Sequence, residues 1–159
     1  MHTPHYDGID LDQLAAALDD GHDHGGNPIV SFVDEEGGWP LRCCLANAAP
    51  GDEVAIIAWS PFPWTGAYAE TGPIVVHTRG CPGPTQPGQL PAAFDSRPMT
   101  IRPYGPDRMI AYHHVRHVPA GKSVREAVEA VLAEPDVSFV HGRNATGGCY
   151  AFTAVQHQR

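Results

Sequence analysis

The chain has 159 residues, 42% of them apolar, and a formal net charge of -8. This length suits one hydrophobic core, so we expect a single domain over residues 1–159. An acidic chain lacks the excess of positive charge that proteins use to bind nucleic acid. No apolar run approaches the roughly 18 residues of a membrane-spanning helix. We therefore expect a soluble protein that binds neither nucleic acid nor membranes. Its N-terminus shows no secretion signal, which favours the cytoplasm.

The first predicted element is a helix over Leu11–Asp19, where apolar residues recur at helical spacing. Asp10 is expected to cap this helix, with Gln13 at the third position as in a capping box. Gly21 should end the helix, because glycine adopts the left-handed conformation found after a helix C-terminus.

The middle of the chain is predicted to be β-structure, because 16 prolines and 17 glycines leave few windows for helices. Val54–Trp59 is apolar on both alternating faces, which indicates a central strand. Two proline-containing stretches, Ser60–Pro73 and Cys81–Pro98, are expected to be irregular and either functional or mobile. The expected strands are Ile29–Val33, Leu41–Ala46, Val54–Trp59, Ile74–Thr78, Met99–Tyr104 and Arg108–Arg116.

A second helix is predicted to begin at Ser123, which forms a capping box with Glu126. It is followed by two strand-like runs, Val137–Arg143 and Cys149–Val155, which a glycine-containing turn joins into a C-terminal hairpin. The fold class that follows is α+β: an antiparallel or mixed β-sheet with two amphipathic helices packed against it.

The strand predicted at Leu41–Ala46 carries two adjacent cysteines. Alternation would place Leu41, Cys43 and Leu45 on one apolar face, which makes Cys43 a small buried hydrophobe. Arg42 and Cys44 would share the other face, where the guanidinium could favour the thiolate of Cys44. Alternatively, Arg42 pairs with an acidic residue and Cys44 is packed in the core.

The C-terminal hairpin carries a second group of polar residues. Arg143 could bind an anionic or carboxylate ligand bidentately, with Asn144 orienting it. Alternatively, Asn144 serves the turn and Cys149 lies in the core. Cys149 with His77 or His141 would also supply the nucleophile and base of a cysteine-dependent enzyme, although no local signature of a known cysteine hydrolase surrounds it.

Metal binding has weaker support in the sequence. On a strand, His113 and His114 would point to opposite faces, and His113 and His117 would be about 13 Å apart, too far to share an ion. Four further residues have the ligand types of a zinc site but are scattered along the chain: Cys44, His77, Cys81 and Cys149. We therefore predict no metal site and no cofactor.

Three ordered motifs stand out beyond these local patterns. They are Arg42-x-Cys44-Leu45, the segment Pro61–Ile74 leading to His77, and His141-x-Arg143-Asn144-Ala145-x-x-Gly148-Cys149. Together they resemble a bacterial domain-of-unknown-function family of small single-domain proteins, with actinomycete and rhizobial members. The likeness covers Trp39–Val155 and implies no reaction.

Our leading hypothesis is a binding protein for a small polar or anionic molecule, with a pocket between the C-terminal hairpin and the Pro61–Pro73 loop. One alternative is a cysteine-dependent enzyme that uses Cys149 with His77 or His141. The other is a protein–protein interaction module, and the oligomeric state stays open. The predicted ligand-binding residues are Arg42, Cys44, Trp64, Tyr68, Glu70, Arg143 and Asn144.

Overall fold

A computed structural model describes residues 3–157, and its helices and antiparallel sheets confirm an α+β protein. The chain folds as two compact units. Residues Gly8–Thr85 form one, here called the central unit, and the chain up to Asp7 together with the chain from Gln86 onward forms the other, here called the terminal unit. The expectation of one domain over the whole chain stays a prediction.

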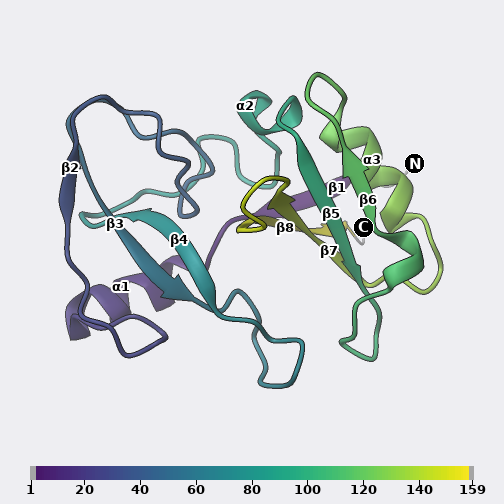
Figure 1. Ribbon diagram of the computed structural model, residues 1–159, viewed down its shortest axis with the longest axis horizontal. Helices are drawn as coiled ribbons and strands as arrows, with labels where there is room; N and C mark the ends of the chain where they lie inside the picture. Colours follow the sequence, from purple (N-terminus) through teal and green to yellow (C-terminus); the bar gives the residue numbers. More distant parts are fainter. Residues whose placement is uncertain (1–2, 158–159) are drawn as a thin grey trace. The chain divides into compact units, whose positions relative to one another are not determined.

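The central unit is built on a short antiparallel sheet. Its elements are α1 (Leu11–Asp20), β2 (Phe32–Asp34), β3 (Asp52–Trp59) and β4 (Gly72–His77), with the strands in the order β2-β3-β4 (Figure 1). The prediction of a central strand at Val54–Trp59 is confirmed by β3. Burial on both faces is only partly right, because Val54 is fully buried whereas Ile56 is 51% exposed.

The helix α1 begins and ends as its sequence predicts. The carboxylate of Asp10 accepts a hydrogen bond from the backbone N–H of Gln13 at 2.8 Å, and Leu14 is the buried residue of the helix. Gly21 follows with a φ of 83° and donates its N–H to the carbonyl of Ala17. Local capping therefore fixes both ends.

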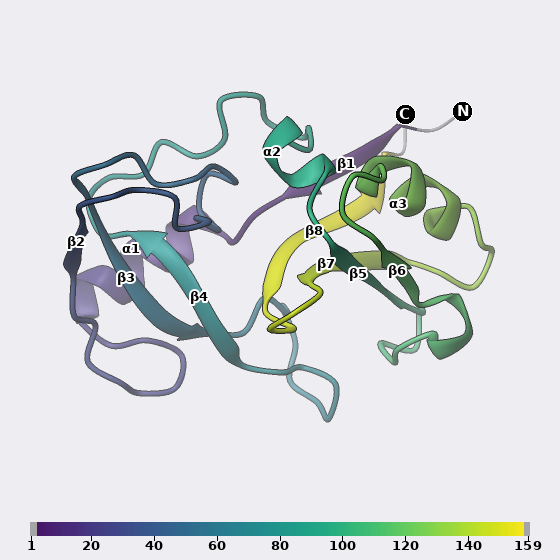
Figure 2. The same ribbon diagram turned by 45° about the horizontal axis from the view of Figure 1, so that its top comes forward.

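The terminal unit contains one five-stranded antiparallel sheet in the order β1-β8-β7-β5-β6. Helix α3 contacts all five of its strands, and Figure 2 shows this helix lying along the sheet. The bounds of the elements are β1 (Pro4–Asp7), α2 (Ala92–Asp95), β5 (Met99–Tyr104), the 3-10 turn η1 (Tyr112–His114), β6 (Arg116–Val118), α3 (Val124–Leu132), β7 (Phe139–Asn144) and β8 (Tyr150–Gln156).

The predicted C-terminal helix and hairpin are confirmed in the terminal unit. The hydroxyl of Ser123 accepts from the backbone N–H of Glu126 at 3.2 Å, which caps α3. Strands β7 and β8 pair in antiparallel register, with an irregularity between Gly142 and Arg143. Phe152 covers Gly142 so closely that a Cβ there would lie 2.3 Å from its ring.

The predicted strand at Leu41–Ala46 is wrong, because this segment is a turn. The N–H of Leu41 donates to the carbonyl of Ala46, and Leu45 has a left-handed φ of 55° between them. The alternation that suggested a strand arises because the turn is buried: Leu41, Cys43 and Leu45 are almost fully covered, and so is Arg42.

The predicted strand at Arg108–Arg116 is also wrong. Asp107 accepts a hydrogen bond from the N–H of Met109, Gly105 donates to the carbonyl of Met109, and Arg108 has a φ of 66°. These local bonds hold the chain in a turn, and a 3-10 turn over Tyr112–His114 follows before the short strand β6. The expectation that His113 and His114 point to opposite faces of a strand therefore does not apply, because these residues lie in the 3-10 turn.

Two smaller differences concern irregular regions. Strand β2 covers Phe32–Asp34 and begins three residues after the predicted Ile29. The stretch Cys81–Pro98 contains the short helix α2.

Within residues 3–157, no helix has the length and hydropathy needed to cross a bilayer.

Candidate metal centre

The turn at Leu41–Ala46 presents two consecutive cysteines to the same neighbour. The N–H of Arg42 donates to the carbonyl of Val75, which ties the turn to β4. The Sγ atoms of Cys43 and Cys44 lie 3.7 and 3.9 Å from Nδ1 of His77, the last residue of β4. The expectation that the two cysteines occupy opposite faces is therefore wrong, because a turn does not alternate its side chains as a strand does.

Cys81 completes the group from the segment after β4. Gly80, with a left-handed φ of 47°, lets the chain change direction between His77 and Cys81. Three cysteine Sγ atoms and one histidine nitrogen then all lie within 4.8 Å of one another, contributed by Cys43, Cys44, His77 and Cys81. We call these four residues the Cys3His cluster.

Backbone N–H groups and a carboxylate support the cluster. His77 donates its N–H to Sγ of Cys43 at 3.4 Å, and the backbone of Gly83 hydrogen-bonds to Cys81. The other ring nitrogen of His77, Nε2, lies 3.0 Å from the carboxylate of Asp52, at the start of β3. The ring is thereby held with Nδ1 toward the sulfurs and Nε2 toward the carboxylate.

The cluster separates the pKa values of its thiols. Hydrogen bonds with Cys43 and Cys44, assisted by His77, hold the pKa of Cys81 far below its usual range. Hydrogen bonds with Cys44 and Cys81, together with burial, raise the pKa of Cys43. The hydrogen bonds among the three sulfurs therefore favour the thiolate form at Cys81 over that at Cys43.

The pKa values of His77 and Asp52 are also shifted, in opposite directions. Burial lowers the pKa of His77, but the hydrogen bond with Asp52 and the nearby Cys81 outweigh it, and the net shift is upward. The hydrogen bond from His77 lowers the pKa of Asp52. Asp52 thus stays a carboxylate that can orient the ring by accepting a hydrogen bond from Nε2.

This donor set matches what a zinc ion needs. With Zn–S of about 2.3 Å and Zn–N of about 2.05 Å, a tetrahedral site has S···N edges of about 3.6 Å and S···S edges of about 3.8 Å. The two S···N distances in the cluster, 3.7 and 3.9 Å, are close to that edge. Burial falls from Cys43, which is almost fully covered, to Cys44, His77 and Cys81, which are half-buried and reachable by an ion.

Two of the residues predicted to act in catalysis lie in the terminal unit. Cys149 is half-buried, and its Sγ is 3.8 Å from the carbonyl of Gly147. His141 is buried, and its ring lies within 5.4 Å of three aromatic ring centroids. Burial, assisted by Arg143 and Arg102, holds the pKa of His141 well below its usual range. His77, the third predicted residue, belongs to the Cys3His cluster.

The predicted ligand-binding arginines are both buried. Arg42 donates to the carbonyl of Pro40, within its own turn. Arg143 donates from Nη1 to the carbonyl of Gly148 at 3.2 Å, which braces the hairpin turn that Asn144 opens. Whether either side chain holds a ligand stays a prediction.

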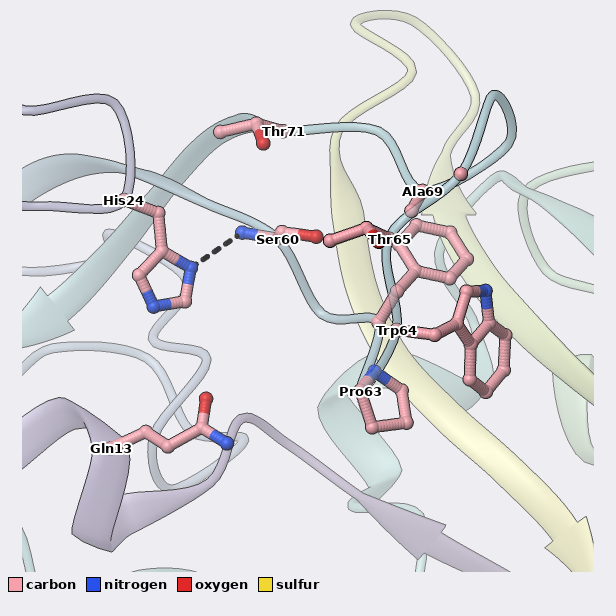
Figure 3. A pocket seen from close by; sticks show the side chains of 10 residues that line it. Gln13, His24, Ser60, Pro63, Trp64, Thr65, Ala69 and Thr71 are labelled. Carbon is pink, nitrogen blue, oxygen red and sulfur yellow. Dashed lines mark hydrogen bonds between the residues drawn. The ribbon is translucent and has the colours of Figure 1, made fainter.

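The Ser60–Pro73 segment lines a hollow of about 550 Å³ in the central unit. Figure 3 shows Gln13 of α1 and His24 on one side of it and Pro63 and Trp64 on the other. The N–H of Ser60 donates to Nδ1 of His24 at 3.0 Å. Of the three ligand-binding residues predicted in this segment, Trp64 lines the hollow. Tyr68, which is half-buried, and Glu70, which is exposed, lie outside its lining.

The sequence analysis predicted no metal site, although it named several residues of the Cys3His cluster for their ligand types. Among the four scattered residues with zinc-ligand types, the structure brings together Cys44, His77 and Cys81, and it places Cys149 in the terminal unit. Cys43 was missed because the strand interpretation assigned it to the core. The adjacent pair Cys43–Cys44 and the spacing His77-x-x-x-Cys81 are signals that could have found it, since paired ligands at short spacing are typical of zinc sites.

The sequence matches the family described as "Protein of unknown function (DUF1203)" over residues 38–156. The chain belongs to this family. The match confirms the resemblance inferred from the three motifs, and it contains the whole Cys3His cluster together with Asp52. DUF1203 membership assigns no activity. Neither the curated proteins nor the solved structures gave a match to this chain.

Proposed function

We propose that this DUF1203 protein binds a zinc ion through Sγ of Cys43, Cys44 and Cys81 and Nδ1 of His77. The observation that carries the proposal is the convergence of four ligand atoms within 4.8 Å, with S···N separations close to a tetrahedral edge. Three sulfurs and one imidazole form a donor set that favours zinc over magnesium or calcium, which prefer oxygen.

The surroundings of the cluster support the same proposal. Histidines that ligate zinc commonly donate the second ring N–H to a carboxylate, which fixes the tautomer and the orientation of the ring. Asp52 stands 3.0 Å from Nε2 of His77 in that position. N–H groups directed at sulfur, such as that of His77 to Cys43, favour the thiolate form that binds metal.

Four protein ligands leave no coordination position for a substrate, so the zinc has a structural role. It would connect the turn at Leu41–Ala46, the end of β4 and the segment that begins at Cys81. Apart from β4, these segments have little regular structure. Because the unfolded chain holds no preformed site, the free energy of zinc binding would stabilise the folded central unit.

The zinc content of the purified, untagged protein tests the proposal. We expect one zinc per chain by elemental analysis, and its loss in Cys43→Ser, Cys81→Ser and His77→Ala. Cys149→Ser is the matched control, because it removes a half-buried thiol outside the cluster. The proposal is wrong if the wild type, refolded with zinc and dialysed, holds no metal, or if Cys149→Ser loses as much as the cluster variants.

A second candidate function has its own support. Asp52, His77 and the cluster sulfurs stand in the order carboxylate, imidazole, thiol, which is the arrangement that activates a cysteine nucleophile. Cys81 would be the nucleophile in place of the expected Cys149. Alkylation with iodoacetamide separates the candidates: zinc that protects Cys81 supports the structural site, and rapid alkylation that zinc leaves unchanged supports the enzyme.

The small-molecule hypothesis stays a separate proposal for the C-terminal hairpin. It is supported by the buried guanidinium of Arg143, which is followed in the sequence by Asn144. We also propose a cytoplasmic location. All four cysteines are free rather than disulfide-bonded, and thiols persist in a reducing compartment. Fractionation of cells that express the full chain tests the location.

A further inference from the structure

The terminal unit contains a second convergence of metal-ligating side chains. His113 and His114 are the last two residues of the 3-10 turn η1, and Asp136 follows the C-terminal end of α3. One nitrogen from each histidine and one carboxylate oxygen lie within 4.8 Å of one another. None of these residues belongs to the Cys3His cluster.

The carboxylate of Asp136 contacts both imidazole rings, one with each oxygen. Its Oδ2 is 3.1 Å from Nε2 of His113, and its Oδ1 is 2.9 Å from Nε2 of His114. The two imidazole rings are 3.9 Å apart between centroids. Two like rings and one carboxylate thus direct their ligand atoms to a common region.

The two N···O separations, one to each oxygen of the carboxylate, are close to the edge of an octahedral site. With metal–nitrogen and metal–oxygen distances of about 2.1 Å, adjacent ligands of an octahedron are about 3.0 Å apart. A tetrahedral ion of the same bond length would need edges of about 3.4 Å. The same separation also suits N–H···O hydrogen bonds from Nε2, which an ion bound to these atoms would replace.

Space for further ligands lies beside the three residues. His113 and Asp136 border a hollow of about 430 Å³, which is also lined by the turn from Gly105 to Tyr112. Asp107, in that turn, brings a second carboxylate to the hollow. His113 and Asp136 are 67% and 49% exposed, so an ion and small ligands can reach them.

We propose that His113, His114 and Asp136 form a second metal site, of the two-histidine, one-carboxylate type, for a divalent first-row transition ion. Two nitrogens and one oxygen suit such an ion, and three protein ligands leave exchangeable positions, in contrast to the closed Cys3His cluster. The two sites differ in donor type, so they select different metals. This site would hold an ion that keeps water or a small anionic ligand in the hollow.

Calorimetric titration of the full, untagged chain with Ni²⁺ tests this site, after the Cys3His cluster has been filled with one equivalent of zinc. Where the wild type takes up no zinc, the same titration is performed on Cys43→Ser, so the result does not depend on the first site. We expect one equivalent of Ni²⁺ to bind. Asp136→Asn and His113→Gln should each weaken binding at least about tenfold, since even an outer-shell partner contributes that much.

His117→Gln is the matched control, because it removes an exposed histidine of β6 that lies outside the group. Its Ni²⁺ affinity should equal that of the wild type. His113 is largely exposed, so His113→Gln should fold even where Asp136→Asn does not. No binding by the wild type, unchanged binding by His113→Gln, or an equal loss in His117→Gln would each overturn the proposal.

Discussion

The two compact units hold their polar clusters in different ways. In the central unit the Cys3His cluster is partly buried, rich in sulfur, and braced by backbone N–H groups and Asp52. In the terminal unit His113 and Asp136 are exposed and His114 is half-buried, and the core of the neighbouring sheet is built from other residues. We infer from this difference that the Cys3His cluster contributes to the fold of its unit, whereas the fold of the terminal unit does not depend on His113, His114 and Asp136.

The amount of regular secondary structure in each unit explains that difference. The terminal unit has five paired strands and a helix that contacts each of them. The central unit has three strands, of which β2 is only three residues long, and long irregular connections. We expect a unit with so little regular structure to gain most from a metal, because a bound ion can hold irregular segments together where strand pairing does not.

Removal of metal should have the largest effect. Structural zinc contributes about 10 kcal/mol or more to zinc-finger peptides, and a third of that would lower the thermal midpoint of this chain by about 10 °C. We expect such a shift when the zinc-loaded protein is treated with a strong chelator, measured by calorimetry. Added zinc should restore it.

Hydrogen exchange locates the effect of the chelator. The amide of His77, which donates to Cys43, should lose protection, whereas those of β7 in the terminal unit should keep it. Equal loss in both units would contradict the contrast drawn between them.

Gly142→Ala should destabilise the terminal unit and leave zinc binding by the central unit unchanged. A Cβ at this position would lie 2.3 Å from the ring of Phe152, and that fully buried ring has little room to move. We expect a loss of about 2 kcal/mol in the free energy of unfolding, measured with urea, because overpacking strains a core.

Gly66→Ala is the control for this substitution, since a Cβ there meets no atom within 4 Å. Its stability should change by less than about 0.5 kcal/mol. Gly142→Ala should retain the zinc stoichiometry of the wild type. A variant that loses zinc would show that the terminal unit supports the cluster.

Asp52→Asn should weaken the Cys3His cluster without removing a ligand. The amide keeps the shape of the carboxylate but gives up its charge, so the ring of His77 is less well oriented and less basic. We expect zinc affinity to fall by about 10- to 100-fold, measured by competition with a chromophoric chelator. Asp52→Glu should recover part of the loss if charge is the cause.

Local signals predicted much of this structure. Asp10 and Ser123 fix the helix starts through bonds that span three residues, so α1 and α3 could be predicted from sequence. β5 was predicted at its observed bounds for a similar reason, because a paired strand shows its alternation directly. The buried turn at Leu41–Ala46 imitates that alternation without pairing as a strand, and there the prediction failed.

Long-range contacts account for what the sequence did not show. Cys43 and His77 are 34 residues apart, and their contact depends on how the turn docks on β4. Asp52 has no signature, since any acidic residue at a strand start looks the same. Asp136 meets His113 and His114 only because the turn after α3 and the 3-10 turn lie together, which no local pattern reveals.

The smallest predicted effect concerns pH and the terminal unit alone. Burial keeps the pKa of His141 well below its usual range, so the folded chain leaves it neutral while the unfolded chain protonates it below about pH 6.5. The unfolded state then binds more protons, and stability falls as the pH drops through this value. Between pH 7.5 and 5.5 we expect a loss of about 1 kcal/mol from this group.

His141→Phe isolates this contribution in urea denaturation at the two pH values. Phenylalanine suits a site surrounded by Tyr104, Phe139 and Tyr150, and it cannot titrate. The pH dependence of unfolding should therefore be shallower by about 1 kcal/mol, whereas His117→Gln, an exposed position, should leave it unchanged. If the free energy of unfolding of His141→Phe depends as steeply on pH as that of the wild type, protonation of other groups destabilises the chain. The central unit, whose thiolates and His77 also respond to acid, would then be the pH-sensitive part.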